Sequence, residues 1–193
     1  MKSVSLVTLE YKNPSGLGKL ITSVCETADY DMYEWVIHDN SLENIGIMRG
    51  MNLLFTRMKG EYILLLNDDM HPTKSGWLKS AMETIKEKEV LTPRIYTGRF
   101  GSAWEVAPML AHRSIFSDAG GLDERFIGYG SDDTDWCIRA RLFGWKPKEF
   151  DFGFKHTSAG RGDFSKRVDK FKKINAEILS KKWGGLEGEV ASV

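Results

Sequence analysis

Two adjacent carboxylates follow the most hydrophobic stretch of the chain. Residues 62–66 read Tyr-Ile-Leu-Leu-Leu, and Asn67-Asp68-Asp69 comes directly after them. Neighbouring carboxylates at the end of a buried strand repel each other and lose hydration, which is unfavourable without a cation. A divalent metal that bridges a diphosphate would remove that penalty. A solvated turn with helix-capping aspartates explains the same residues, so this motif alone leaves both interpretations open.

A second group of acids lies in a glycine-rich segment. Residues 120–136 contain four glycines, followed by Asp132, Asp133 and Asp135 at the expected start of a helix. Glycines allow a tight loop that other groups can approach closely. Capping and the helix dipole account for one acid at such a position. Three acids exceed that need, and together with His156, in a later loop, they could supply a general base and a metal ligand.

The elements that must position these residues alternate between strands and helices. The strand-like runs are 4–9, 33–38 and 62–66, and the helical patterns that follow them are 17–24, 45–58 and 77–88. Three such β-then-α units predict an α/β fold with a mainly parallel sheet and helices on both faces. Ligands of these sheets bind beyond the carboxyl ends of the strands. Polar clusters stand at three of these ends, at 8–10, 39–41 and 67–69.

The second half of the chain is less regular. It predicts a strand over 104–112, a helix over 132–143, a helix with one basic face over 165–183 and a frayed tail over 184–193. We interpret 1–183 as one domain, with a donor half at about 1–95 and an acceptor half at about 96–160. The small residues that follow His156 could form a lid that closes over a ligand and brings Arg161 and Lys166 to a diphosphate.

Composition narrows the functional classes. The 193 residues are 41% hydrophobic and 28% charged, which is typical of a soluble globular protein. The 27 basic and 27 acidic side chains cancel, so net charge gives no support for nucleic-acid binding. No signal peptide or stretch of 18 apolar residues is present, so we expect a cytoplasmic protein without a transmembrane helix. The basic face of 165–183 is solvated or contacts an anionic acceptor or a membrane surface. Cys25 and Cys137 are expected to be free thiols.

Residues 120–146, GGLDERFIGYGSDDTDWCIRARLFGWK, resemble the acceptor-side motif of inverting GT-A glycosyltransferases. The similarity is to the galactosyltransferase-type Gly-Trp-Gly-(Glu/Asp)-Asp segment and to the Glu-Asp motif of family-two enzymes. Upstream, Asn67-Asp68-Asp69 stands where the family has Asp-X-Asp, and the resemblance covers about 3–156. Three positions depart from the pattern: Asn67 replaces the first acid, Asp132 replaces the usual Glu, and Tyr129 stands in place of Trp.

The resemblance implies a GT-A fold and a role for each motif residue. Asp69 and His156 would bind Mn²⁺, or Mg²⁺ as the second choice, with Asp68 nearby and Asn67 toward the ribose. Asp133 would be the general base that deprotonates the acceptor hydroxyl, and Asp132 would hold acceptor hydroxyls.

A nucleotide site would lie at the ends of the first two strands. Asp39 would accept a hydrogen bond from the ring N–H that uracil, thymine and guanine carry, and Thr8 and Glu10 would line the base and ribose pocket. The resemblance favours UDP over dTDP and GDP.

The sequence therefore predicts a metal-dependent, inverting transfer of a sugar from a nucleoside-diphosphate donor to an acceptor hydroxyl, on a glycan. One alternative is a sugar nucleotidyltransferase, which needs a glycine-rich basic loop after the first strand, whereas residues 10–14 read Glu-Tyr-Lys-Asn-Pro. The other alternative is a binding module that retains a nucleotide pocket without catalysis.

Overall fold

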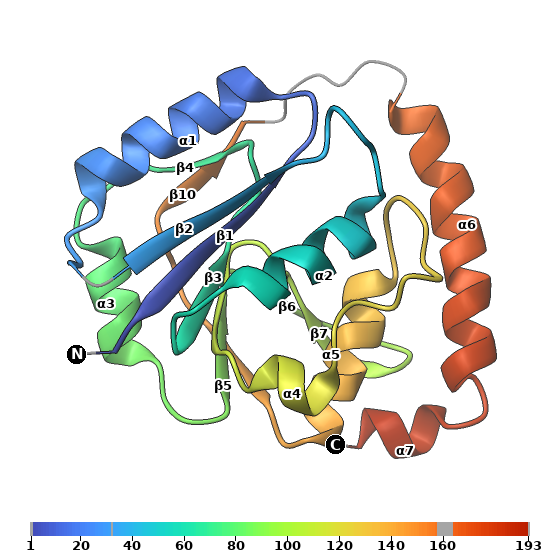
Figure 1. The fold of residues 1–193 in the computed structure, drawn as a ribbon. Helices are drawn as coiled ribbons and strands as arrows, with labels where there is room; N and C mark the ends of the chain where they lie inside the picture. The colour runs from blue at the N-terminus through green and yellow to red at the C-terminus, as the bar shows by residue number, and fades with distance from the viewer. Residues whose placement is uncertain (1, 32, 158–163, 193) are drawn as a thin grey trace.

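The computed structural model describes residues 2–31, 33–157 and 164–192 (Figure 1). The helices are α1 (Pro14–Thr27), α2 (Ile47–Arg57), α3 (Trp77–Thr84), α4 (Ile115–Ala119), α5 (Asp132–Leu142), α6 (Phe164–Trp183) and α7 (Glu187–Ala191). The strands are β1 (Val4–Glu10), β2 (Tyr33–Asp39), β3 (Tyr62–Leu65), β4 (Met70–Pro72), β5 (Glu89–Thr92), β6 (Ile95–Gly98), β7 (Gly101–Trp104), β8 (Met109–His112), β9 (Lys146–Glu149) and β10 (Phe154–His156).

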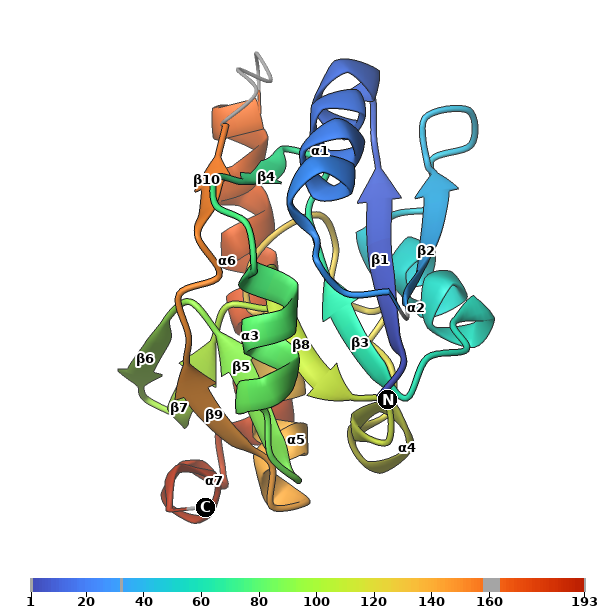
Figure 2. The same cartoon turned by 90° about the vertical axis from the view of Figure 1, so that its left-hand side faces the viewer.

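A six-stranded sheet in the order β2-β1-β3-β8-β5-β9 forms the centre of the fold. β1 runs parallel to both β2 and β3, and β9 runs parallel to β5. Only β8 runs against its neighbours within this sheet. The arrowheads of β1, β2 and β3 point the same way in Figure 2, toward the end of the molecule where β4 and β10 lie. The expected α/β class with a mainly parallel sheet is confirmed.

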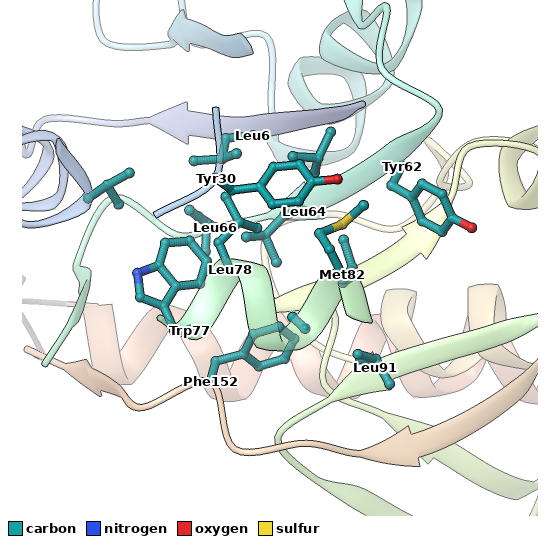
Figure 3. Close-up of a cluster of buried hydrophobic side chains, with 14 of the residues drawn as sticks. Leu6, Tyr30, Tyr62, Leu64, Leu66, Trp77, Leu78, Met82, Leu91 and Phe152 are labelled. Atoms are coloured by element: carbon teal, nitrogen blue, oxygen red, sulfur yellow. The ribbon is translucent and has the colours of Figure 1, made fainter. Parts of the chain in front are cut away.

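Helices cover both faces of this sheet. On one face, Leu20 of α1 is buried in the same cluster as the sheet residues. Trp77 and Leu78 of α3 pack there against sheet residues such as Leu64 (Figure 3). On the other face, α2, α4 and α5 pack against alternate sheet residues such as Ile63. β3 is buried along its whole length because both of its faces are covered, which explains its uninterrupted apolar sequence.

A third apolar cluster joins the C-terminal helices to the outer side of α5. Leu179 of α6 and Val190 of α7 are buried against Phe126 and Ile138. The buried guanidinium of Arg141 donates a 2.8 Å hydrogen bond to the carbonyl of Val190. The frayed tail predicted from residue 184 is therefore wrong for α7, which has a buried apolar side chain and a buried hydrogen bond.

Several other elements differ from the sequence-based prediction. The strand expected over 104–112 is two strands, because β7 pairs with β6 in a separate hairpin whereas β8 enters the central sheet. The helix expected to reach Lys88 ends at Thr84. The short strands β4 and β10 pair with each other and were not predicted. Among the described residues, no helix combines the length and the hydrophobicity that crossing a bilayer requires.

Asp135 is fully buried where α5 meets α6. Its carboxylate accepts hydrogen bonds from Arg139 (3.0 Å) and from the indole of Trp183 (2.8 Å), and it lies 2.8 Å from the ammonium of Lys182.

Removing one member of a buried ion pair leaves the other charge without compensation. We expect Asp135→Ala to lower the free energy of unfolding by about 3 kcal/mol, measured by urea denaturation. Glu177→Ala, an exposed carboxylate on α6, should change stability by less than about 0.5 kcal/mol. Equal stability of the two variants would contradict this role for Asp135.

Candidate functional site

The carboxyl ends of β1, β2 and β3 bring the three predicted polar clusters together. Glu10 and Asp39 are partners in the parallel register of β1 and β2, and Asn40 continues this ladder by donating its N–H to the carbonyl of Glu10 (2.9 Å). Leu66 donates its N–H to the carbonyl of Val7 (2.9 Å), which carries the chain beyond β3 toward the same edge. Sheet pairing alone therefore assembles these residues, as the sequence predicts.

A hydrogen-bond network joins the ends of β1 and β2. The Ser41 hydroxyl donates to Glu10 (2.8 Å), and the Ser41 N–H donates to the exposed Asp39 (2.7 Å). The bond from the Ser41 N–H lowers the pKa of Asp39 below its ordinary value. Asp39 is thus an exposed, ionised acceptor, as a contact with a ring N–H requires. Glu10 is buried and also accepts the N–H of Asn13, so it holds the loop after β1 in place.

Thr8 does not take part in this network. Its side chain is fully buried, and its hydroxyl accepts a 3.1 Å hydrogen bond from the indole of Trp35. The prediction that Thr8 lines a base and ribose pocket is wrong for this arrangement, because Thr8 has no surface to offer a ligand.

The three residues that follow Leu66 face different surroundings. Asn67 is exposed, whereas Asp68 is buried and accepts the N–H of Tyr11 (3.1 Å). The backbone carbonyl of Asp68 also accepts a hydrogen bond from the side chain of Asn13 (3.2 Å). Asp68 therefore ties the segment after β3 to the loop after β1, a structural role that the motif does not reveal.

Asp69 and His156 meet, although 87 residues separate them. The imidazole Nε2 of His156 lies 3.1 Å from Asp69 Oδ1. Antiparallel pairing of β4 with β10 places His156 opposite Met70, and Thr157 binds the carbonyl of Asp69 through its N–H (2.8 Å) and its hydroxyl (3.0 Å). His156 thus lies in a short strand and not in the loop that the sequence suggested, and this strand fixes its position.

The Asp69–His156 pair fits a divalent cation that arrives with its ligand. One carboxylate oxygen and one imidazole nitrogen suit Mn²⁺, and Mg²⁺ accepts one or two carboxylates with the remaining positions filled by phosphate oxygens and water. Within the described residues, no group of three or more His, Cys, Asp or Glu side chains could hold a metal. A phosphate-bearing ligand would complete the coordination.

The three acids at the start of α5 diverge. Successive helical positions are about 100° apart, so Asp132, Asp133 and Asp135 cannot share one direction. Asp133 accepts a 2.9 Å hydrogen bond from the hydroxyl of Tyr96 in the β6–β7 hairpin. Asp132 accepts the N–H of Gly130 (3.0 Å), and Asp135 points into the interface with α6. Asp132 and Asp133 remain candidates for chemistry, whereas Asp135 is structural.

Burial raises the pKa of Asp132 to about 6, and the charge of Asp133 adds to the shift. The neutral form of this carboxyl is therefore favoured compared with an exposed aspartate. Burial and the carboxylate of Asp133 likewise raise the pKa of Tyr96, so this hydroxyl remains a hydrogen-bond donor at neutral pH.

Asn175 of α6 holds the loop that leads to these acids. This fully buried side chain accepts the N–H of Ile127 (3.0 Å) and donates to the carbonyls of Ile127 (2.9 Å) and Gly130 (2.8 Å). A Cβ on Gly128 would lie 2.4 Å from the ring of Phe171, so only glycine allows the loop to approach α6 this closely. Asn175 was not predicted as a site residue, although it stands out in the sequence as a polar residue within the apolar stripe of the last long helix.

A pocket of about 90 Å³ connects the two acidic motifs. Asn67, which begins the first motif, and Asp132, which begins α5, both line it. Its remaining wall is apolar and comes from α2, α4, α5, the end of β3 with Leu66, the segment before β8, and Leu122 in the loop between α4 and α5. The two motifs therefore face one space. The predicted lid with Arg161 and Lys166 lies outside the described residues and side chains.

Comparison with known proteins identifies the fold. No family model and no curated protein matches the chain. Solved structures do match: Staphylococcus aureus TarS has a TM-score of 0.61 and 15% identity over 94% of this chain, which spans 43% of that protein. A mannosyltransferase from Pyrobaculum calidifontis, in complex with GDP-Man and Mn²⁺, has a TM-score of 0.65 and 10% identity over 99% of this chain and 72% of its own.

The catalytic domain of Drosophila β1,4-galactosyltransferase 7, in complex with xylobiose, has a TM-score of 0.64 and 14% identity over 83% of this chain and 72% of its own. These are GT-A glycosyltransferases, so the GT-A fold expected from the sequence is confirmed. At such identities, the likeness identifies the fold only.

The raised pKa of Asp132 makes a prediction about stability. An acid whose pKa is higher in the folded than in the unfolded state destabilises the fold once pH exceeds its unfolded pKa, and the effect is complete above its folded pKa of about 6. Asp132→Asn cannot ionise, and its amide oxygen can still accept the Gly130 N–H. We expect this variant to match the wild type near pH 4 and to be more stable by on the order of 2 kcal/mol at pH 7.5, measured by urea denaturation. If the difference in unfolding free energy between Asp132→Asn and the wild type is the same at both pH values, the pKa of Asp132 is not raised in the folded state.

Proposed function

We propose that this protein is a metal-dependent, inverting glycosyltransferase that moves a sugar from a nucleoside-diphosphate donor, with UDP favoured, to a hydroxyl of a glycan acceptor. The observation that carries the proposal is the pocket that Asn67 and Asp132 both line. This pocket joins the Asn67-Asp68-Asp69 motif to the acids at the start of α5 within a GT-A fold. The reaction requires those two motifs to act on opposite sides of one sugar. Location in the cytoplasm and contact of α6 with a membrane remain predictions from the sequence.

The donor nucleotide would bind at the ends of β1 and β2. Asp39 offers an exposed, ionised carboxylate to a ring N–H, and its bond from the Ser41 N–H fixes the orientation of that carboxylate. Uracil, guanine and thymine carry such an N–H, so this contact selects against adenine and cytosine. Glu10 keeps this part of the site in place by accepting hydrogen bonds from the Ser41 hydroxyl and from the Asn13 N–H in the loop after β1.

The diphosphate would lie against Asp69 and His156, which would hold Mn²⁺ or Mg²⁺ together with the phosphate oxygens. When bound, the metal supplies Lewis-acid stabilisation of the negative charge on the departing nucleoside diphosphate. The pairing of β4 with β10 keeps the carboxylate and imidazole adjacent before any ligand arrives. This pre-organisation lowers the entropic cost of ordering the site.

The acceptor hydroxyl would transfer its proton to Asp133. As the proton leaves, the acceptor oxygen attacks the anomeric carbon while the bond to the diphosphate breaks, so one displacement inverts the anomeric configuration. The hydrogen bond from Tyr96 orients the Asp133 carboxylate. Asp132 has the pKa of about 6 that favours a general base near neutral pH, so it is the second candidate for this role.

The loop after β1 argues against a sugar nucleotidyltransferase. Such an enzyme needs backbone N–H groups that cradle phosphates, but here Tyr11 donates its N–H to Asp68 (3.1 Å) and Lys12 donates its N–H to Ser41 (2.7 Å). Asn13 donates its N–H to Glu10. The side chains of Asp68, Ser41 and Glu10 therefore already occupy these N–H groups, and release of nucleoside diphosphate, not pyrophosphate, is expected.

The metal assignment predicts a chelator-sensitive enzyme. UDP with Mn²⁺ should raise the melting temperature of the wild type, because binding to the native state stabilises it, and EDTA should abolish the shift. Asp69→Ala should lose the shift and turnover while remaining folded. Asp151→Ala, which removes an exposed carboxylate paired with Lys74, should behave as the wild type does. Full transfer in excess EDTA would refute the metal requirement.

The assignment of the base predicts a loss of rate without a loss of binding. Asp133→Asn can still accept the hydrogen bond of Tyr96 but cannot take a proton. It should bind UDP and Mn²⁺ normally and lose roughly two to four orders of magnitude in transfer rate, measured as UDP release with acceptor. An active Asp133→Asn beside an inactive Asp132→Asn would move the base to the preceding residue.

A further inference from the structure

The pocket between the two acidic motifs has a chemical character that the proposed reaction does not explain. Its wall is formed largely by Met51 and Phe55 of α2, Phe116 of α4 and Trp136 of α5. The ring centroids of Phe55 and Phe116 lie 3.9 Å apart, and those of Phe116 and Trp136 lie 5.4 Å apart. Against this wall, the polar lining side chains are those of Asn67 and Asp132.

The position of the pocket relates it to the transferred sugar. Asn67 stands two residues before the metal candidate Asp69, and Asp132 directly precedes the base candidate Asp133. In a single displacement, the sugar ring lies between the leaving diphosphate and the base that activates the acceptor. A space that touches both motifs therefore lies beside that ring and can receive one of its substituents.

A hydroxyl is a poor match for this space. A hydroxyl that enters a mainly aromatic pocket loses hydration and finds partners only at the entrance, which is unfavourable. The volume of about 90 Å³ is about three times the share of one water in the liquid. A substituent with a polar first part and an apolar end would satisfy both parts of the lining.

We propose that this pocket receives the acetamido group of a 2-acetamido-2-deoxyhexose, so that the donor is a nucleotide-activated N-acetylhexosamine. The methyl group packs against the aromatic wall of Phe55, Phe116 and Trp136. The amide N–H donates to the Asp132 carboxylate, and the amide carbonyl accepts from the Asn67 side chain. This inference rests on the proposed function and adds the class of sugar to it.

The direct test compares matched donors. Dissociation constants of UDP, UDP-GlcNAc, UDP-GalNAc, UDP-Glc and UDP-Gal are measured by calorimetry with Mn²⁺, and hydrolysis of each donor is followed as UDP release. A pocket that accepts or lacks an apolar group typically discriminates by roughly 10–200-fold. We expect at least one N-acetylated donor to exceed its parent hexose by tenfold or more in affinity or in kcat/KM. Equal values within both pairs would overturn the proposal.

Variants that fill the pocket test its location. Met51→Trp and, in the loop between α4 and α5 that also lines the pocket, Leu122→Phe should lower the affinity for the preferred N-acetylated donor about tenfold or more and leave UDP and the hexose donors unchanged. Unchanged UDP affinity shows that the variant is folded. Thr56→Trp adds the same ring to the exposed side of α2 and should have no effect. A preference that survives both filling variants would place the selectivity elsewhere and overturn the proposal.

Failure of the proposed function and failure of the acetamido pocket give different results in these measurements. If neither UDP nor another nucleoside diphosphate binds with Mn²⁺, the proposed function fails before the pocket is tested. If the protein binds GDP or dTDP in preference to UDP, the pocket is tested with an N-acetylated sugar and its parent hexose attached to that nucleotide. If UDP binds and the hexose donors are preferred, the proposed function stands and the acetamido pocket is refuted.

Discussion

Parallel pairing of β1 with both β2 and β3 concentrates negative charge at one edge of the sheet, and the surrounding structure offsets that charge. Glu10, Asp39 and Asp68 each accept hydrogen bonds from backbone N–H groups or from Ser41, so the loops after β1 and β2 take the shapes that these carboxylates impose. Asp69 is matched by an imidazole from a distant strand instead. The same repulsion that destabilises this edge when its carboxylates lack partners would favour a cation there, and only through that cation a diphosphate.

Regularity along the chain determined how much of the fold could be predicted. The apolar run of β3 and the helical spacing of apolar residues around it indicate which side chains are buried. The α/β class could therefore be predicted from the sequence. So could the meeting of the first two polar clusters with Asn67-Asp68-Asp69. The strands β4 and β10 have three residues each and no period to detect. Their pairing joins residues about 85 positions apart, and for that reason His156 was assigned to a loop.

In the candidate site, too, some features could be predicted from residue types and others depend on distant partners. Residue types indicated Asp132 and Asp133 correctly as neighbours at a helix start, but the helix rotation that directs Asp133 to Tyr96 and Asp135 to Trp183 depends on partners in other parts of the chain. Thr8 illustrates the opposite error: a polar residue near a strand end was assigned to the site, whereas the indole of Trp35 occupies its hydroxyl inside the fold. A sequence motif identifies available chemistry, and three-dimensional neighbours decide whether a ligand can reach it.

The bonds of Asn175 also set an order of events during synthesis of the chain. The loop at 127–130 is made 45 residues or more before the side chain that binds its carbonyls. Domains generally fold as units, and N-terminal domains fold first during synthesis. The pairings of β1 with β2 and β3 lie within the first 65 residues, but β3 also pairs with β8 and Asp69 contacts His156, so later residues complete this edge too. The loop at 127–130 depends in the same way on α6, so a chain that ends before residue 175 lacks the side chain that binds the loop's carbonyls.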